Sequence, residues 1–238
     1  MIEAVVFDWG GTLTPWLTVD PHESWRAYAC ALHPDDTERA AEAARRLHEA
    51  DLAHWAGARD EHRAFTLAQV VADALLVPDP ASLEHKAALE AYREFWVQAT
   101  HTDPQAAPML VALRERGLRL GVLSSTPWPA AWHEEWLRRD GVLHLFDACV
   151  WSSDLPWTKP HPSAFRAALD AVGVSDPARC VYVGDRPYDD VSGAKAVGMR
   201  AVLVPHSTIP LHQQVPVDVT PDGVLHRLAD LPELIADW

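Results

Sequence analysis

Five short apolar runs divide this 238-residue chain, and they constrain its fold more than any other feature. Each run is rich in β-branched residues and is bounded by Gly, Ser, Asp or Pro. Near-continuous apolarity of this kind is typical of parallel strands that are covered on both faces. The runs are residues 2–7, 118–123, 148–151, 180–183 and 201–204.

Helical patterns lie between several of these runs, at residues 107–116, 162–172 and 190–197. A glycine follows each pattern, and glycine is a common residue just after a helix end. Alternating strands and helices predict an α/β fold with a Rossmann-like, doubly wound parallel sheet.

The segment from residue 17 to residue 100 differs from the rest, because it contains no strand pattern. It predicts an α-helical subdomain inserted after the first strand, with residues 1–16 and 101–238 forming the core. Asp35 or Asp36 is a candidate N-cap for the second of its helices. The helix-period stretches are residues 23–32, 36–54, 61–76 and 82–98.

Composition excludes several classes of function. The formal net charge is −14, which repels nucleic-acid backbones, so we expect no nucleic-acid partner. The three cysteines are widely spaced and predict neither a disulfide framework nor a thiolate metal site. The sequence has no signal-peptide pattern and no apolar stretch of membrane-spanning length, so we expect a cytoplasmic location and no membrane partner. We expect the protein to be a monomer or a homodimer.

Polar residues at the ends of the apolar runs are the candidates for chemistry, because open parallel sheets bind ligands beyond the carboxyl ends of their strands. Asp8 ends the first run and precedes two glycines, which let the backbone approach a ligand closely. Ser124 and Lys159 offer a hydroxyl and an ammonium to an anionic oxygen.

A group of carboxylates, Asp185, Asp189 and Asp190, follows the fourth run. Crowded carboxylates are costly unless a hard cation neutralises them, and this predicts a Mg²⁺ site.

These four motifs, in this order, resemble those of the haloacid dehalogenase-like hydrolase superfamily. The first is Phe7-Asp8-Trp9-Gly10-Gly11-Thr12-Leu13, the second Ser124, the third Lys159-Pro160, and the fourth Gly184-Asp185 with Asp190. The resemblance implies that the helical insertion is a cap that selects the substrate.

The resemblance also implies roles for individual residues. Asp8 would attack phosphorus in a small phosphorylated metabolite, and Mg²⁺ would be held by Asp8, Asp185 and the carbonyl of Gly10. Asp190, with Asp189 as the alternative, would support the metal. Contacts to the phosphoryl oxygens would come from Lys159, Ser124, the adjoining Ser125, and the turn at Gly11 and Thr12.

One departure from the family pattern affects the chemistry. The second aspartate of the first motif, which protonates the leaving group in the family's phosphatases, is Gly10 here. Three explanations remain open. In the first, Asp20 or His22 supplies the proton. In the second, the chain resembles the phosphonoacetaldehyde hydrolases, which use a cap lysine that would here be Lys86. In the third, the protein binds phosphorylated ligands without turnover. A metal-free dehalogenase is a further alternative, ranked below the phosphonate hydrolase.

Overall fold

A computed structural model describes residues 1–76, 83–205 and 215–238. Its strands form one parallel sheet in the order β3-β2-β1-β4-β5-β6. Five strands match the five apolar runs to within two residues, and the two-residue β6 was not predicted. The strands are β1 (Ala4–Phe7), β2 (Arg119–Ser124), β3 (Ala148–Trp151), β4 (Cys180–Gly184), β5 (Arg200–Leu203) and β6 (Gly223–Val224).

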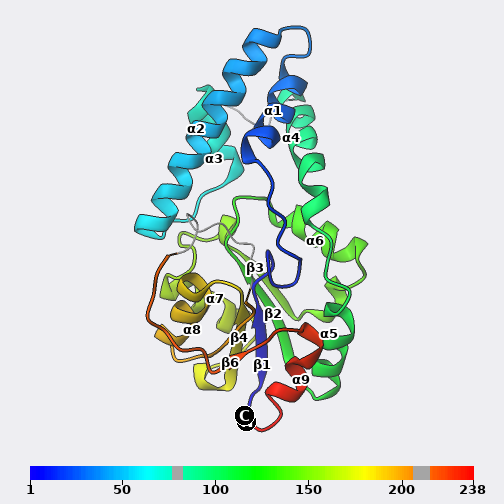
Figure 1. Ribbon diagram of the computed structural model, residues 1–238, viewed down its shortest axis with the longest axis vertical. Coiled ribbons are helices and arrows are strands. Elements are labelled where there is room, and N and C mark those ends of the chain that lie inside the picture. Colours follow the sequence, from blue (N-terminus) through cyan, green and yellow to red (C-terminus); the bar gives the residue numbers. More distant parts are fainter. Residues whose placement is uncertain (77–82, 206–214) are drawn as a thin grey trace.

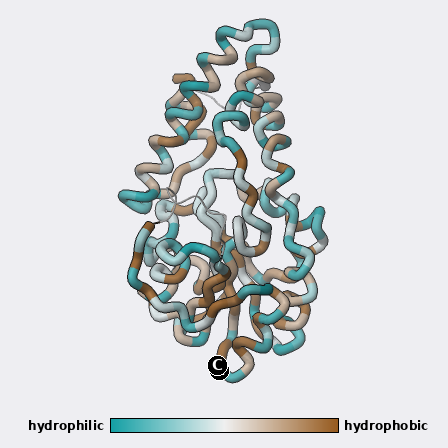
Figure 2. Tube along the Cα trace, in the orientation of Figure 1, coloured by the Kyte–Doolittle hydropathy of each residue, from teal (hydrophilic) through white to brown (hydrophobic). Residues whose placement is uncertain are grey.

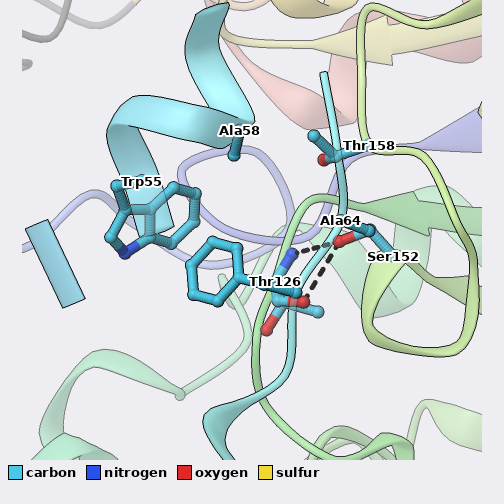
Figure 3. Close-up of a pocket in the computed structure, with 7 residues that line it drawn as sticks. Trp55, Ala58, Ala64, Thr126, Ser152 and Thr158 are labelled. Carbon is cyan, nitrogen blue, oxygen red and sulfur yellow. Dashed lines mark hydrogen bonds between the residues drawn. The ribbon is translucent and has the colours of Figure 1, made fainter. Parts of the chain in front are cut away.

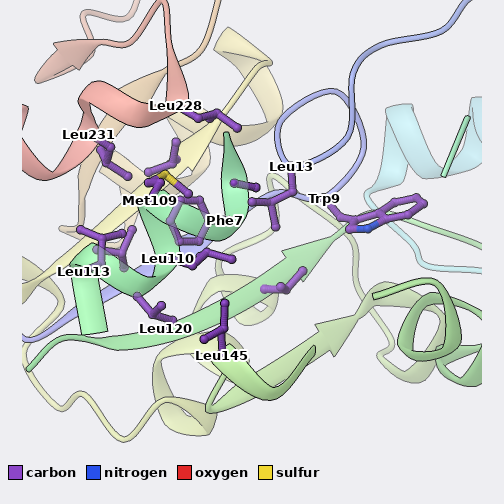
Figure 4. Close-up of a cluster of buried hydrophobic side chains, with 14 of the residues drawn as sticks. Phe7, Trp9, Leu13, Met109, Leu110, Leu113, Leu120, Leu145, Leu228 and Leu231 are labelled. Atoms are coloured by element: carbon purple, nitrogen blue, oxygen red, sulfur yellow. The ribbon is translucent and has the colours of Figure 1, made fainter. Parts of the chain in front are cut away.

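Helices cover both faces of the sheet, which confirms the predicted doubly wound α/β fold (Figure 1). Along β1, Val5 and Phe7 are buried on one face, while Ala4 and Val6 are buried on the other. Figure 4 shows Phe7 among the leucines of one face, and Figure 2 shows how apolar residues concentrate in the strands. The first face is covered by α5 (Ala106–Glu115), α6 (Ala130–Arg139) and α9 (Leu231–Leu234), and the second by α7 (Pro162–Ala171) and α8 (Gly193–Ala196).

The strand order places β1 at the point where the direction of winding reverses. The chain proceeds from β1 to β2 and β3 on one side, and then crosses to β4 on the other. Phe7 pairs with Val122 of β2 and with Val183 of β4, so all three strands end at the same edge. In open α/β sheets ligands bind at such a reversal, beyond the carboxyl ends of the strands.

Four further helices lie beyond this edge of the sheet, in the region predicted to be helical (Figure 1). They enclose an apolar cluster of their own that includes Trp25, Leu47, Val70 and Tyr92. None of the helices in the described part of the chain has the length and apolarity needed to cross a membrane. The four helices are α1 (Pro21–Leu32), α2 (Thr37–Glu61), α3 (Leu67–Leu75) and α4 (Leu83–Trp96).

Several helix boundaries differ from the sequence-based prediction. Asp36 caps α2 as predicted, because its carboxylate accepts a hydrogen bond from Arg39 N at 3.0 Å. However, α2 continues to Glu61, and α3 starts only after Thr66, which forms a reciprocal capping box with Gln69. The expected first residue of α4, Ser82, lies outside the described residues.

The helix predicted over residues 190–197 is divided into a π-helical turn, η5 (Pro187–Ser192), and the short helix α8. Short 3₁₀ turns complete the described structure. They are η1 (Val97–Ala99), η2 (Leu143–Leu145), η3 (Ser152–Asp154), η4 (Pro177–Arg179) and η7 (Leu228–Asp230).

Candidate active site

Asp8 lies directly after β1 and is 5% exposed. Its backbone N–H donates to the carbonyl of Val183 at 2.8 Å, which fixes Asp8 at the edge shared by β1 and β4. The chain then turns sharply at Gly11, which has φ +84°. A Cβ on Gly11 would lie 2.7 Å from Asp185 Oδ2, so this position requires glycine for both its conformation and its space.

Gly10 has different surroundings from Gly11. A Cβ placed on Gly10 would meet no heavy atom of the described chain within 4 Å. A Cβ at position 10 is therefore not obstructed. Position 10 accepts a Cβ but carries no acidic side chain.

Lys159 joins the first, third and fourth motifs. Its ammonium lies 2.8 Å from Asp8 Oδ1 and 2.6 Å from Asp190 Oδ1. Burial by itself would lower the pKa of Lys159, but Asp190 and Asp8 outweigh it and raise that pKa well above its ordinary value. Lys159 is therefore a buried cation held between two carboxylates.

Tyr182 is a site residue that sequence reasoning missed, because it lies within an apolar strand pattern. Its hydroxyl donates to the carbonyl of Leu123 at 2.8 Å and accepts from the ammonium of Lys159 at 3.0 Å. The phenol thus helps to orient Lys159 and accepts the third hydrogen bond of its ammonium, the other two being accepted by Asp8 and Asp190.

Three buried carboxylates, those of Asp8, Asp185 and Asp190, each offer an oxygen within 4.8 Å of the others. Both oxygens of Asp185 lack a hydrogen-bond partner, although the residue is only 2% exposed. Burial, followed by the charges of Asp190 and Asp8, raises the pKa of Asp185 well above its ordinary value. An unpartnered buried carboxylate beside a second one suits a divalent cation with oxygen ligands.

The structure separates the roles of Asp189 and Asp190. Asp190 is fully buried, and its oxygens accept from the ammonium of Lys159 and from Arg186 N at 2.9 Å. Asp189 is half-buried and lies outside the carboxylate cluster; burial and the charge of Asp190 raise its pKa to about 6. Gly184 makes room for Asp190, because a Cβ there would lie 2.3 Å from its carboxylate.

Hydroxyl groups surround the same edge of the sheet. Ser124 is 4% exposed at the end of β2, and Ser125 Oγ accepts from Thr158 Oγ1 at 2.6 Å. The hydroxyl of Thr12 is buried without a partner, so it is available to an anionic oxygen. Thr126 is turned away from these groups, since its hydroxyl pairs with His133 Nε2 at 3.0 Å.

Asp20 and His22, the candidate proton donors, and Lys86, the candidate cap lysine, all lie in the helical region. The carboxylate of Asp20 accepts from His22 N at 2.9 Å and caps α1. The His22 ring packs edge-on against His48 of α2, with centroids 5.4 Å apart. Lys86 is exposed on α4.

A cluster of aromatic rings, formed by Trp9, His133 and Trp151, packs against the first motif and was not predicted from the sequence. Trp9 packs edge-on against His133, with centroids 4.6 Å apart, and His133 stacks on Trp151 at 4.1 Å. Burial of His133 lowers its pKa to about 3, so the imidazole is neutral at ordinary pH. This packing fixes the residue that separates Asp8 from Gly10.

A small crevice lies where the helical region meets the sheet edge (Figure 3). Trp55 and Ala58 of α2 face Thr126 and Thr158 across it, and Ser152 is hydrogen-bonded to Thr126. The helical region therefore closes directly over the loops that carry the second and third motifs.

Comparison with known proteins identifies the family. The family model for haloacid dehalogenase-like hydrolases matches residues 2–198. This chain belongs to that family. It is therefore a hydrolase, and the resemblance inferred from the four motifs is confirmed.

Individual relatives extend this comparison. A glyceraldehyde 3-phosphate phosphatase from Methanopyrus kandleri is 28% identical over all of this chain and 98% of the relative. A phosphoserine phosphatase from Thermus thermophilus is 35% identical over 55% of this chain and 49% of the relative. The crystal structure of a 2-haloacid dehalogenase from Pseudomonas syringae superimposes with a TM-score of 0.65 at 27% identity, covering all of both chains.

Proposed function

We propose that the protein is a Mg²⁺-dependent phosphatase that acts on a small phosphorylated metabolite through an aspartyl-phosphate at Asp8. The observation that carries this proposal is the buried Asp8 carboxylate, paired with Lys159 at 2.8 Å and adjoining the unpartnered Asp185. A carboxylate, a fixed cation and a cation site at one strand edge are the groups that phosphoryl transfer requires.

Asp8, Asp185 and the carbonyl of Gly10 would hold the metal. Both oxygens of Asp190 are engaged by Lys159 and Arg186, so Asp190 would support the site by fixing Lys159. When bound, Mg²⁺ would neutralise the carboxylates and the charge on the phosphoryl group.

The phosphoryl oxygens would be bound by Lys159 and Ser124, with Ser125, Thr12 and the backbone turn at Gly11 nearby. The ammonium supplies a fixed positive charge, and the buried hydroxyl of Thr12 supplies a free donor. The ammonium would stabilise charge that spreads over the phosphoryl oxygens during transfer, and it would exchange one of its three present contacts for such an oxygen.

In the reaction, an oxygen of Asp8 forms a bond to phosphorus while the bond from phosphorus to the leaving alcohol breaks. Water then attacks the aspartyl-phosphate, which releases phosphate and restores Asp8. Because Gly10 offers no acidic side chain, solvent would supply the leaving-group proton. General acid–base catalysis is worth about 10²- to 10⁴-fold, so a slow phosphatase is expected.

The helical region, residues 17–100, would serve as the cap of a core formed by residues 1–16 and 101–238. Its own apolar cluster and its position over the strand ends support this division (Figure 1). The names of the two phosphatase relatives support small phosphorylated metabolites as the substrate class.

Binding of a phosphorylated ligand without turnover is the second candidate, and the lack of an acidic side chain at Gly10 favours it. The phosphonate hydrolase interpretation has less support, because Lys86 is an exposed residue of α4.

The proposal is tested with phosphomonoesters, phosphonoacetaldehyde and haloacids, each assayed with and without Mg²⁺ on wild type and Asp8→Asn. We expect Mg²⁺-dependent release of phosphate from monoesters only, and its loss in Asp8→Asn. Turnover that needs no metal or survives the loss of Asp8 would refute the mechanism. Thermal stabilisation by phosphate and Mg²⁺ without any turnover would instead establish the binding protein.

A further inference from the structure

A hydrogen bond joins the helical region to the loop of the fourth motif. His62 Nε2, just after α2, lies 3.1 Å from the hydroxyl of Tyr188 in η5. We propose that His62 is a positioning residue that, through Tyr188, holds η5 in the conformation that keeps Asp190 on Lys159 beside the site that Asp8 and Asp185 offer to a divalent cation. This inference rests on the metal site of the proposed function.

The segment that carries His62 is fixed to the core by its backbone. Thr158 N donates to the carbonyl of His62 at 2.9 Å, and Ala64 N donates to the carbonyl of Pro156 at 3.1 Å. Arg63 forms an antiparallel bridge with Trp157, and its guanidinium lies 5.6 Å from the centre of the indole. His62 thus belongs to a short ladder of backbone hydrogen bonds that ends at Thr158, the residue before Lys159.

The conformation of His62 is unusual for a residue with a side chain. Its φ is +57°, in the left-handed region, where it ends α2. Such a conformation costs of order 1 kcal/mol and persists only where surrounding contacts hold it. Here the contacts that hold it are those to Thr158, which precedes Lys159, and to Tyr188, which lies in the same turn as Asp190.

Tyr188 belongs to the same turn as Asp190. Val191 N donates to the carbonyl of Arg186 at 3.2 Å, a bond that spans five residues and gives η5 its π-helical form. The side chain of Ser192 donates to the carbonyl of Tyr188 and closes the turn. Single π-turns occur frequently at functional sites, and this one directs Asp190 inward to Lys159.

The two contacts of His62 therefore connect the cap segment to the third and fourth motifs together. A displacement of His62 would release the Tyr188 hydroxyl and loosen the turn that holds Asp190. Coupling of this kind is reciprocal, so occupation of the metal site would in turn favour the docked position of the His62 segment.

The test compares wild type with Tyr188→Phe, which removes one hydroxyl, and with His62→Phe. Calorimetric titration with Mg²⁺ alone should show affinity weakened roughly two- to tenfold in each variant, the range for one hydrogen bond. The double variant should be no weaker than either single variant, because both remove the same interaction. Amide exchange of residues 189–192, measured without metal, should be faster in all three.

The matched control is Arg93→Gln. Arg93 of α4 pairs with Glu135 of α6, so the variant breaks another contact between the helical region and the core, remote in sequence from η5. It should leave Mg²⁺ affinity and exchange at residues 189–192 unchanged.

The inference would be overturned if Tyr188→Phe kept the amide exchange and the Mg²⁺ affinity of wild type. It would also be overturned if Arg93→Gln changed both quantities as much as Tyr188→Phe does. Failure of the proposed function has a different signature. If wild type and Asp185→Asn bind Mg²⁺ equally poorly, the metal assignment is wrong, and the exchange measurement still decides whether His62 orders η5.

Discussion

The ammonium of Lys159 lies 2.8 Å from the carboxylate of Asp8, and 151 residues separate the two in the chain. The side chain of Lys159 is 3% exposed and that of Asp8 is 7% exposed, so neither charge is well solvated. Removal of one partner of a buried ion pair leaves an uncompensated charge, which is more costly than the pair itself.

Lys159→Met should therefore lower the free energy of unfolding by about 3–5 kcal/mol at neutral pH, as measured by urea denaturation. Folding raises the pKa of Lys159, so the ammonium stabilises the folded protein fully at any pH below the pKa of Lys159 in the unfolded chain. This contribution is lost only as the pH rises through the higher pKa of the folded state. Lys195→Met is the control, since Lys195 forms an exposed pair with Asp222. A loss of about 1 kcal/mol or less is expected there, and equal losses in both variants would contradict the prediction.

Gly10→Asp should raise the rate of phosphate release by about 10²- to 10⁴-fold, because it restores a general acid at a position where an added Cβ would meet no heavy atom within 4 Å. The measurement is kcat with a monoester that the wild type hydrolyses. Gly10→Asn has nearly the same shape without the acid and should leave kcat near the wild-type value. An equal rate increase in both variants would show that proton donation is not the cause.

Gly11→Ala and Gly10→Ala form a second matched pair. Gly11 has φ +84° and no room for a Cβ beside Asp185, whereas Gly10 is unobstructed. Gly11→Ala should reduce stability by about 1–2 kcal/mol and abolish thermal stabilisation by Mg²⁺. Gly10→Ala should retain that stabilisation. Retention of Mg²⁺ stabilisation in Gly11→Ala would be inconsistent with the close approach of this turn to Asp185.

His133 predicts a pH dependence of stability. Its pKa is about 3 when folded and near 6.5 when exposed, so the unfolded chain binds the extra proton between these values. Stability should therefore fall as pH decreases through that window, by about 2 kcal/mol from this residue at roughly pH 5. His133→Phe should have a shallower dependence in urea titrations between about pH 7 and 4. Parallel curves for the two proteins would disprove the contribution.

Much of the fold was predictable because the core strands are apolar on both faces. The alternation of such strands with helices predicted the doubly wound sheet, and the four motifs at strand ends predicted the family. Predictions were poorest at helix ends. The extension of α2 to Glu61 and the late start of α3 depend on the contacts of His62 and on the cap at Thr66, which periodicity does not reveal.

Within the site, residue types and their order at strand ends identified Asp8, Ser124, Lys159 and Asp185 as candidates, because parallel strands bring their carboxyl ends to one edge. Tyr182 was missed, since a phenol inside an apolar run has no distinguishing local pattern. The link between His62 and Tyr188 was likewise invisible, because it joins segments 126 residues apart.

The sequence by itself determined the layered fold, the strand-end motifs and the absence of the usual acid at Gly10, because these depend on local periodicity and residue chemistry. Only the tertiary structure decided that Lys159 bridges Asp8 and Asp190, that the carboxylate of Asp185 lacks a hydrogen-bond partner, and that a Cβ at Gly10 would be unobstructed. Those facts depend on distances between distant segments, and packing of the whole sheet and its helices sets those distances.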